Sequence, residues 1–141
     1  MTVDQQINNI VANMGRISSY LDKSINAKTI LKRASKVAVQ RMKSKAPVGD
    51  TGNLERSVGF VSARKAKGKV LIGPRYGKGG GNHANLIEFG FIHPSGKRVE
   101  GQPFVLETYQ ETKDQILANL RAELKKEFDK AGRSLPTNIA I

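Results

Sequence analysis

The sequence predicts an α+β fold, with helices near both ends of the chain and short antiparallel hairpins between them. Two observations predict it. Apolar residues recur at spacings of three and four near both ends of the chain, which is typical of amphipathic helices. Between them lie short β-rich runs separated by Gly and Pro, which favour hairpins. With 141 residues, we expect a single domain over 1–141, with 131–141 as its C-terminal tail.

Two helices are expected before residue 47. The first covers about residues 4–21, and the second begins after a candidate N-cap at Ser24. Pro47 should end the second helix, because the residue before a proline is pushed out of the α region. The apolar stripe of the second helix consists of Ala27, Ile30, Leu31, Ala34, Val37, Ala38 and Met42.

A loop and a hairpin should follow. The residue types favour one short helical turn around 53–57. Two β-rich runs, 58–64 and 69–73, flank a turn at 65–68, and Pro74 closes the second run.

The rest of the chain predicts further short elements and one long one. Residues 75–82 are expected to form a flexible glycine-rich loop. A short helix over 83–89 would end at Gly90, and a second hairpin would cover 91–99. A long helix is expected over 104–130. The residues that mark it are Phe104, Tyr109, Ile116, Leu117, Leu120, Leu124 and Phe128.

The positive charge is concentrated in the second helix. The chain has 24 Lys and Arg against 12 Asp and Glu, a net charge of +12, and residues 23–45 contain eight bases and no acid. Two interpretations stay open: a solvated basic face, or a contact face for nucleic acid or an acidic partner. The candidate interface or DNA-path residues are Lys28, Lys32, Arg33, Lys36, Lys43 and, in the glycine-rich loop, Lys78.

Composition and spacing argue against several classes of chemistry. The absence of Cys excludes disulfides, cysteine zinc sites, iron–sulfur clusters and cysteine nucleophiles. Only three residues separate Gly73 from Gly77-Lys78, so the Walker A spacing fails. His83 and His93 each lie five residues from Glu88, a poor metal-ligand spacing. We therefore expect no enzyme activity, no cofactor and no metal.

No apolar run approaches the roughly 18 residues that a membrane span requires. The first residues also lack the basic and apolar regions of a signal peptide. A soluble cytosolic product is expected.

The acidic residues suggest two different environments. Glu88 lies near the end of the short predicted helix, where a carboxylate opposes the helix dipole. Either a basic partner such as Arg75 or Arg56 offsets this, or the turn is not helical and Glu88 is exposed. The acids of the last helix interleave with Lys and Arg, which predicts a solvated face. These acids are Glu111, Asp114, Glu123, Glu127 and Asp129.

The order of these features resembles the tail-completion or neck proteins of long-tailed bacteriophages, also called head–tail joining or minor tail protein Z-like proteins. The resemblance runs from about Ile7 to Phe128. It departs from the family pattern at His83-Ala84, where Tyr-Ala is common, and near 106–108, where Arg-Pro-Ala is frequent. The residues that carry it are Pro47, Thr51, Gly52, Leu54, Ser57, Glu88, Phe89, Gly90, Pro103 and Phe104.

The resemblance implies an α+β subunit, in which a small antiparallel sheet is packed by N-terminal helices and a long C-terminal helix. It also implies a non-enzymatic virion protein, assembled in the host cytoplasm and located at the neck. It implies a self-associated ring, typically of six copies, between the head-closure or connector protein and the tail tube or tail terminator. Viral DNA would pass nonspecifically through the lumen, and no membrane would be involved. Two alternatives stay open: a small basic nucleic-acid-binding protein, and a small regulator that acts on an acidic partner.

Overall fold

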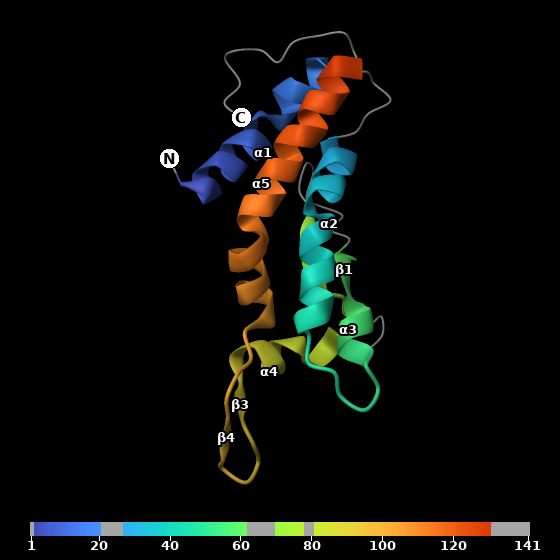
Figure 1. The fold of residues 1–141 in the computed structure, drawn as a ribbon. Helices are drawn as coiled ribbons and strands as arrows, with labels where there is room; N and C mark the ends of the chain where they lie inside the picture. The colour runs from blue at the N-terminus through green and yellow to red at the C-terminus, as the bar shows by residue number, and fades with distance from the viewer. Residues whose placement is uncertain (1, 21–26, 62–69, 78–80, 131–141) are drawn as a thin grey trace. The chain divides into compact units, whose positions relative to one another are not determined.

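The computed structural model of the chain describes residues 2–20, 27–61, 70–77 and 81–130 (Figure 1). The chain divides into two compact units. Unit 1 consists of Met1–Val37, Ala63–Val70 and Lys113–Ile141, and unit 2 consists of Ala38–Ser62 and Leu71–Thr112. The single domain stays a prediction, because two compact units can belong to one domain.

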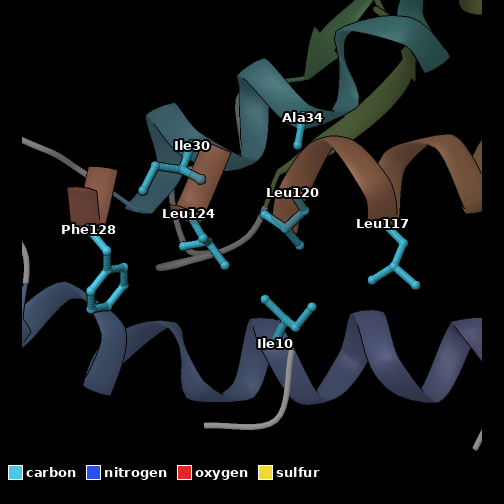
Figure 2. Packing of buried hydrophobic residues seen from close by; sticks show 7 residues of the cluster. All are labelled: Ile10, Ile30, Ala34, Leu117, Leu120, Leu124 and Phe128. Atoms are coloured by element: carbon cyan, nitrogen blue, oxygen red, sulfur yellow. The ribbon is translucent and has the colours of Figure 1, made fainter. Parts of the chain in front are cut away.

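Unit 1 is helical. It contains α1 (Val3–Tyr20), the first part of α2 (Ala27–Lys45) and the last part of α5 (Phe104–Lys130). Figure 2 shows Ile10 of α1 pointing toward Leu120 of α5. The helices pack because each places its apolar residues on one stripe. The buried cluster consists of Ile10, Ile30, Ala34, Leu117, Leu120, Leu124 and Phe128.

Unit 2 combines short helices with two hairpins. After the last part of α2 come α3 (Asn53–Ser57), β1 (Val58–Val61) and β2 (Leu71–Pro74). The 3₁₀ helix η1 (Gly81–His83), α4 (Ala84–Phe89), β3 (Phe91–Ile92), β4 (Arg98–Val99) and the first part of α5 follow.

Both sheets of unit 2 are antiparallel pairs. In the first, Val58 lies opposite Pro74, and in the second, Phe91 lies opposite Val99. The first sheet packs against α2 and the start of α5, because its residue Val58 belongs to the same buried cluster as theirs. That cluster consists of Met42, Ala46, Leu54, Val58, Ala84 and Phe104.

The α+β class and the predicted elements are confirmed, with two corrections. Gly81 and Asn82 belong to η1 rather than to a flexible loop. Gly81 is buried against the Arg75 backbone, and a Cβ there would lie only 2.5 Å from the Arg75 carbonyl oxygen, so the close approach requires glycine. Tyr109 is exposed and does not join the core of α5. Its predicted place is taken by Thr108 and Thr112, whose buried hydroxyls each donate to the carbonyl four residues back.

Some sequence predictions lie outside the described residues. They are the Ser24 cap, the hairpin turn at 65–68 and the C-terminal tail at 131–141. Within the part of the chain that the structure describes, no helix is both long and apolar enough to cross a membrane.

Candidate functional site

The segment after Pro47 forms the loop and short helix that the sequence predicts. Gly52 adopts a left-handed backbone conformation, with φ of 62°, directly before α3. Leu54 then points into the buried cluster of unit 2. Ser57 is fully buried, and its hydroxyl donates to the Leu54 carbonyl oxygen at 2.6 Å. Thr51 is exposed, and its hydroxyl oxygen accepts the Asn53 N–H at 3.4 Å. This segment therefore anchors α3 from both ends.

The two arginines expected near Glu88 are bonded elsewhere. The Arg75 Nε donates to the Ser57 carbonyl oxygen at 2.9 Å, and its Nη2 donates to the Arg56 carbonyl oxygen at 3.3 Å. Nη2 of Arg56 donates to the Thr51 carbonyl oxygen and to Oδ1 of Asn53. Both guanidinium groups thus hold α3 and the chain around it.

Glu88 instead caps the N-terminus of α5. Its Oε2 accepts the Val105 N–H at 3.0 Å, and its Oε1 accepts the Leu106 N–H at 3.1 Å. Such N–H groups in a first helical turn have no partner within the helix. Pro103 just before them has no side-chain acceptor, so a carboxylate from α4 supplies what the local sequence lacks. The positive end of the α5 dipole stabilises that carboxylate. Both earlier interpretations of Glu88, the basic partner and simple exposure in a non-helical turn, are wrong.

Two glycines let the end of α4 approach the chain that leads into α5. Gly90 has φ of 76°, and a Cβ there would collide with the Val99 carbonyl oxygen. A Cβ on Gly101 would lie 2.5 Å from the Glu88 carbonyl oxygen. At this junction the Gln102 N–H donates to the Ile87 carbonyl oxygen at 2.7 Å. The close approach brings the Glu88 carboxylate within reach of α5.

The same region presents an apolar surface. Every large apolar side chain classed as exposed among the described residues belongs to unit 2, and Phe89 is 73% exposed. Most of them fall within residues 86–109, which contain α4, the β3–β4 hairpin and the start of α5. We call this set the 86–109 surface: Leu86, Phe89, Ile92, Val99, Leu106 and Tyr109.

In unit 2, bases of α2 pair with acids of α5. The Arg41 Nε lies 2.7 Å from Oε2 of Glu111, and the Lys45 Nζ lies 2.8 Å from Oε2 of Glu107 and 2.6 Å from Oε1 of Glu111. The hydrogen bond from Lys45 lowers the pKa of Glu111 most, and the hydrogen bond from Arg41 lowers it further. Hydrogen bonds to Glu107 and Glu111 raise the pKa of Lys45.

In unit 1, Arg33 is engaged in the same way. Its Nη1 lies 3.4 Å from Oε1 of Glu127 and 3.7 Å from Oε2 of Glu123. The Glu127 side chain is only 1% exposed, and its other oxygen, Oε2, has no hydrogen-bond partner among the residues that the structure describes. The prediction that the α5 acids form a solvated face is therefore wrong for Glu127. Arg33 acts as an internal partner, although its side chain is half exposed.

Comparison with protein families identifies the family of this chain. The family model "Bacteriophage HK97-gp10, putative tail-component" matches residues 9–90, which is more than half of the chain. The chain belongs to the HK97-gp10-like family. No curated protein and no solved structure matches it significantly. As a bacteriophage tail component, a member of this family is part of the virion.

The family match has a boundary that bears on the site. It includes the segment from Pro47 to Ser57 and ends at Gly90, so Glu88 lies inside it while Pro103 and Phe104 lie outside. In this HK97-gp10-like chain, Phe104 is buried with Leu54, and Glu88 bonds the turn that Phe104 begins. The motif residues on both sides of the boundary thus meet in unit 2. The sequence did not identify Gly101 or the cap that Glu88 provides. A usable signal for the cap was that Pro103 precedes α5 without a capping side chain, so the acceptor had to come from elsewhere in the fold.

The remaining basic candidates of this family member lie on the surface. Lys28, Lys32, Lys36 and Lys43 of α2 are all exposed, whereas Lys78 lies outside the described residues. His93 is also exposed, and its Nδ1 lies 2.9 Å from the Ser95 hydroxyl. Within the described ranges, no group of three or more His, Cys, Asp or Glu could hold a metal ion.

Proposed function

We propose that this tail component is the subunit of a ring, typically of six copies, at the head-proximal end of the phage tail. The ring joins the head-closure or connector complex to the tail tube or tail terminator, and DNA passes through its lumen. Family membership supports the tail part of this proposal. The order of the sequence motifs supports the neck position.

The observation that carries the proposal is the 86–109 surface. Phe89 is 73% exposed, and the apolar side chains three positions before and after it, Leu86 and Ile92, are 49% and 61% exposed. Soluble monomers rarely expose large clustered apolar groups, and such groups usually mark contacts with other proteins. A ring subunit covers such side chains when its neighbours bind, so the surface fits an assembled protein better than a free one.

We further propose that the protein is structural, without catalytic activity or cofactor. The polar groups brought together in unit 2 have structural partners: Glu88 bonds backbone N–H groups, and Arg75 bonds backbone carbonyls. These hydrogen bonds stabilise the conformation of unit 2, which is the role expected of polar groups in a structural subunit.

The basic side chains of α2 fit a DNA path better than a tight nucleic-acid site. Arg33, Arg41 and Lys45 are paired with glutamates of α5, so fewer cations are available for phosphate contacts. Affinity for DNA is lower when a protein neutralises fewer phosphates. Weak and nonspecific contact is what a channel requires if DNA must slide through it.

The test is a phage that lacks this chain. We expect DNA-filled heads and complete tails to accumulate separately, and joined infectious particles to return when the chain is supplied in trans. Electron microscopy counts the three species, and native mass spectrometry of the purified chain gives the number of copies in the ring. Joined particles at normal yield without the chain, or a loss of tails themselves, would contradict a head–tail joining role.

A further inference from the structure

We propose that the ring contact is formed by the β3–β4 hairpin of one copy, which seats against the α2–α3 loop of the next copy. The contact pairs Ile92, Val99 and Lys97 of the hairpin with Val48, Asp50 and Glu55 of the loop and of α3. This inference rests on the proposed function, and it names the surfaces that a ring would use.

The hairpin has the properties of an arm that needs a partner. Every residue from Ile92 to Glu100 is exposed, so three of the four paired residues of the hairpin are exposed and only Phe91 is partly buried. Figure 1 shows this hairpin extending away from α4. Ile92 is 61% exposed and Val99 is 39% exposed. An isolated two-stranded hairpin is at best marginally stable in water, and packing against a further element stabilises it.

The α2–α3 loop offers a matching surface. Val48 in this loop is 70% exposed. Asp50 is exposed nearby, and among the described residues neither Asp50 nor Glu55 has an ion-pair partner. The Arg56 guanidinium beside them donates to Thr51 and Asn53, and the segment 47–57 still carries one net negative charge.

The charge of the hairpin is complementary. Lys97 is exposed and has no ion-pair partner in the described part of the chain, whereas Arg98 pairs with Glu100 at 3.0 Å. The hairpin therefore carries one net positive charge beside its apolar side chains. Complementary charge around an apolar contact favours one orientation of the two surfaces over others.

Symmetry explains why the partner is a second copy. A ring of more than two copies needs two different surfaces on each subunit, because the first surface of one copy binds the second surface of its neighbour. The hairpin and the α2–α3 loop leave unit 2 at separate places in Figure 1, so they supply two such surfaces. Each carries exposed apolar groups, and their net charges are opposite.

The first experiment is a charge reversal on the full chain, read out by native mass spectrometry and sedimentation. Lys97→Glu is expected to raise the concentration for half-assembly about fivefold or more, and Asp50→Lys is expected to do the same. The double variant with both changes should recover assembly. Lys126→Glu, on the exposed face of α5, is the matched control and should assemble normally. Circular dichroism checks that each variant is folded.

The second experiment uses the absence of cysteine from the chain. Ile92→Cys protein is mixed with Val48→Cys protein, reassembled and oxidised. The mixed dimer should exceed both homotypic dimers, because only the mixed pair joins the proposed surfaces.

The outcomes separate the two proposals. A wild-type chain that stays monomeric at every concentration overturns both the ring and this contact. A ring that is indifferent to the charge reversals, that is not restored in the double variant, or that gives only homotypic crosslinks overturns the contact while the ring stands. Loss, recovery and the mixed crosslink together support it.

Discussion

A single carboxylate joins two parts of unit 2 that lie 17 residues apart in the chain. Glu88 accepts the N–H groups of Val105 and Leu106, so the end of α4 is bonded to the beginning of α5. A residue of the helix itself usually supplies such a cap. Here Pro103 occupies the position before α5 and has no acceptor, so the cap comes from elsewhere in the fold.

Removing this cap should destabilise unit 2. We expect Glu88→Gln to cost about 1 kcal/mol, because the amide keeps one acceptor but loses the charge that the helix dipole favours. Glu88→Ala should cost more, about 2 kcal/mol, because both N–H groups lose their partner. Urea denaturation followed by circular dichroism measures both. Asp114→Asn is an exposed control and should change stability by less than about 0.5 kcal/mol; equal stability of all three variants would argue against the cap.

Two glycines of the same region should respond differently to alanine. Gly90→Ala combines a positive φ with a collision against the Val99 carbonyl oxygen, and we expect a loss of about 2–4 kcal/mol. Gly96 also has a positive φ, 84°, but no atom lies within 4 Å of a Cβ placed there. Gly96→Ala should therefore cost only about 1 kcal/mol. Thermal melting ranks the two variants, and the opposite order would contradict the close approach.

Arg33 should matter for stability because of Glu127. Arg33→Ala removes the closest cation from a carboxylate that is 1% exposed, and we expect a loss of about 2 kcal/mol. In a Glu127→Gln background the same substitution should cost less than half as much, because the neutral amide needs no cation. A double-mutant cycle in urea gives the difference. Equal costs in the two backgrounds would show that Arg33 does not stabilise the Glu127 carboxylate.

At the scale of elements, α2 and α5 are bonded within unit 2 by Arg41, Lys45, Glu107 and Glu111. The sequence places the bases in one helix and the acids in another, and each helix alone suggests a solvated face. Because of these ion pairs, protonation of a glutamate in α5 removes the charge partner of a base in α2. Stability should therefore depend on pH.

The direction follows from the pKa of each group. The pKa of Glu111 is lowered from its ordinary value of 4.5, so its contribution is present at neutral pH and is lost as the pH falls through the folded-state pKa, below 4.5. The pKa of Lys45 is raised from 10.5, so its contribution is lost as the pH rises beyond that value. The melting temperature of Glu111→Gln should fall less steeply than that of the wild type below pH 4.5. Parallel curves would show that this pair contributes nothing.

At the scale of the whole molecule, the exposed lysines of α2 are the remaining candidates for contact with DNA or an acidic partner. We expect Lys36→Glu with Lys43→Glu to leave the melting temperature unchanged, because both side chains are exposed. The same variant should lower the yield of joined, DNA-filled particles about tenfold in complementation, since two positive contacts become repulsive. Lys125→Glu with Lys126→Glu on α5 is the matched control. Normal yield from the α2 variant would leave these lysines as a solvated face.

The sequence by itself determined the elements of this protein. The helices at 53–57 and 104–130, and the hairpin around Pro94-Ser95-Gly96, follow from apolar spacing and from turn residues. These signals are local, because a side chain three or four positions away decides which face of a helix is buried. The family resemblance was readable for the same reason, since its motifs mark the ends of these elements.

Only the tertiary structure decided which charged groups meet. Arg33 reaches Glu127 across 94 positions, and Glu88 bonds a helix rather than an arginine. Sequence offers several bases near each acid, and it does not say which backbone N–H groups are left without a partner. Packing selects among them, because a buried carboxylate must lie where the fold brings a donor within hydrogen-bond distance. The exposure of Phe89 and Tyr109 was likewise decided by the fold, since periodicity identifies an apolar residue but not whether anything covers it.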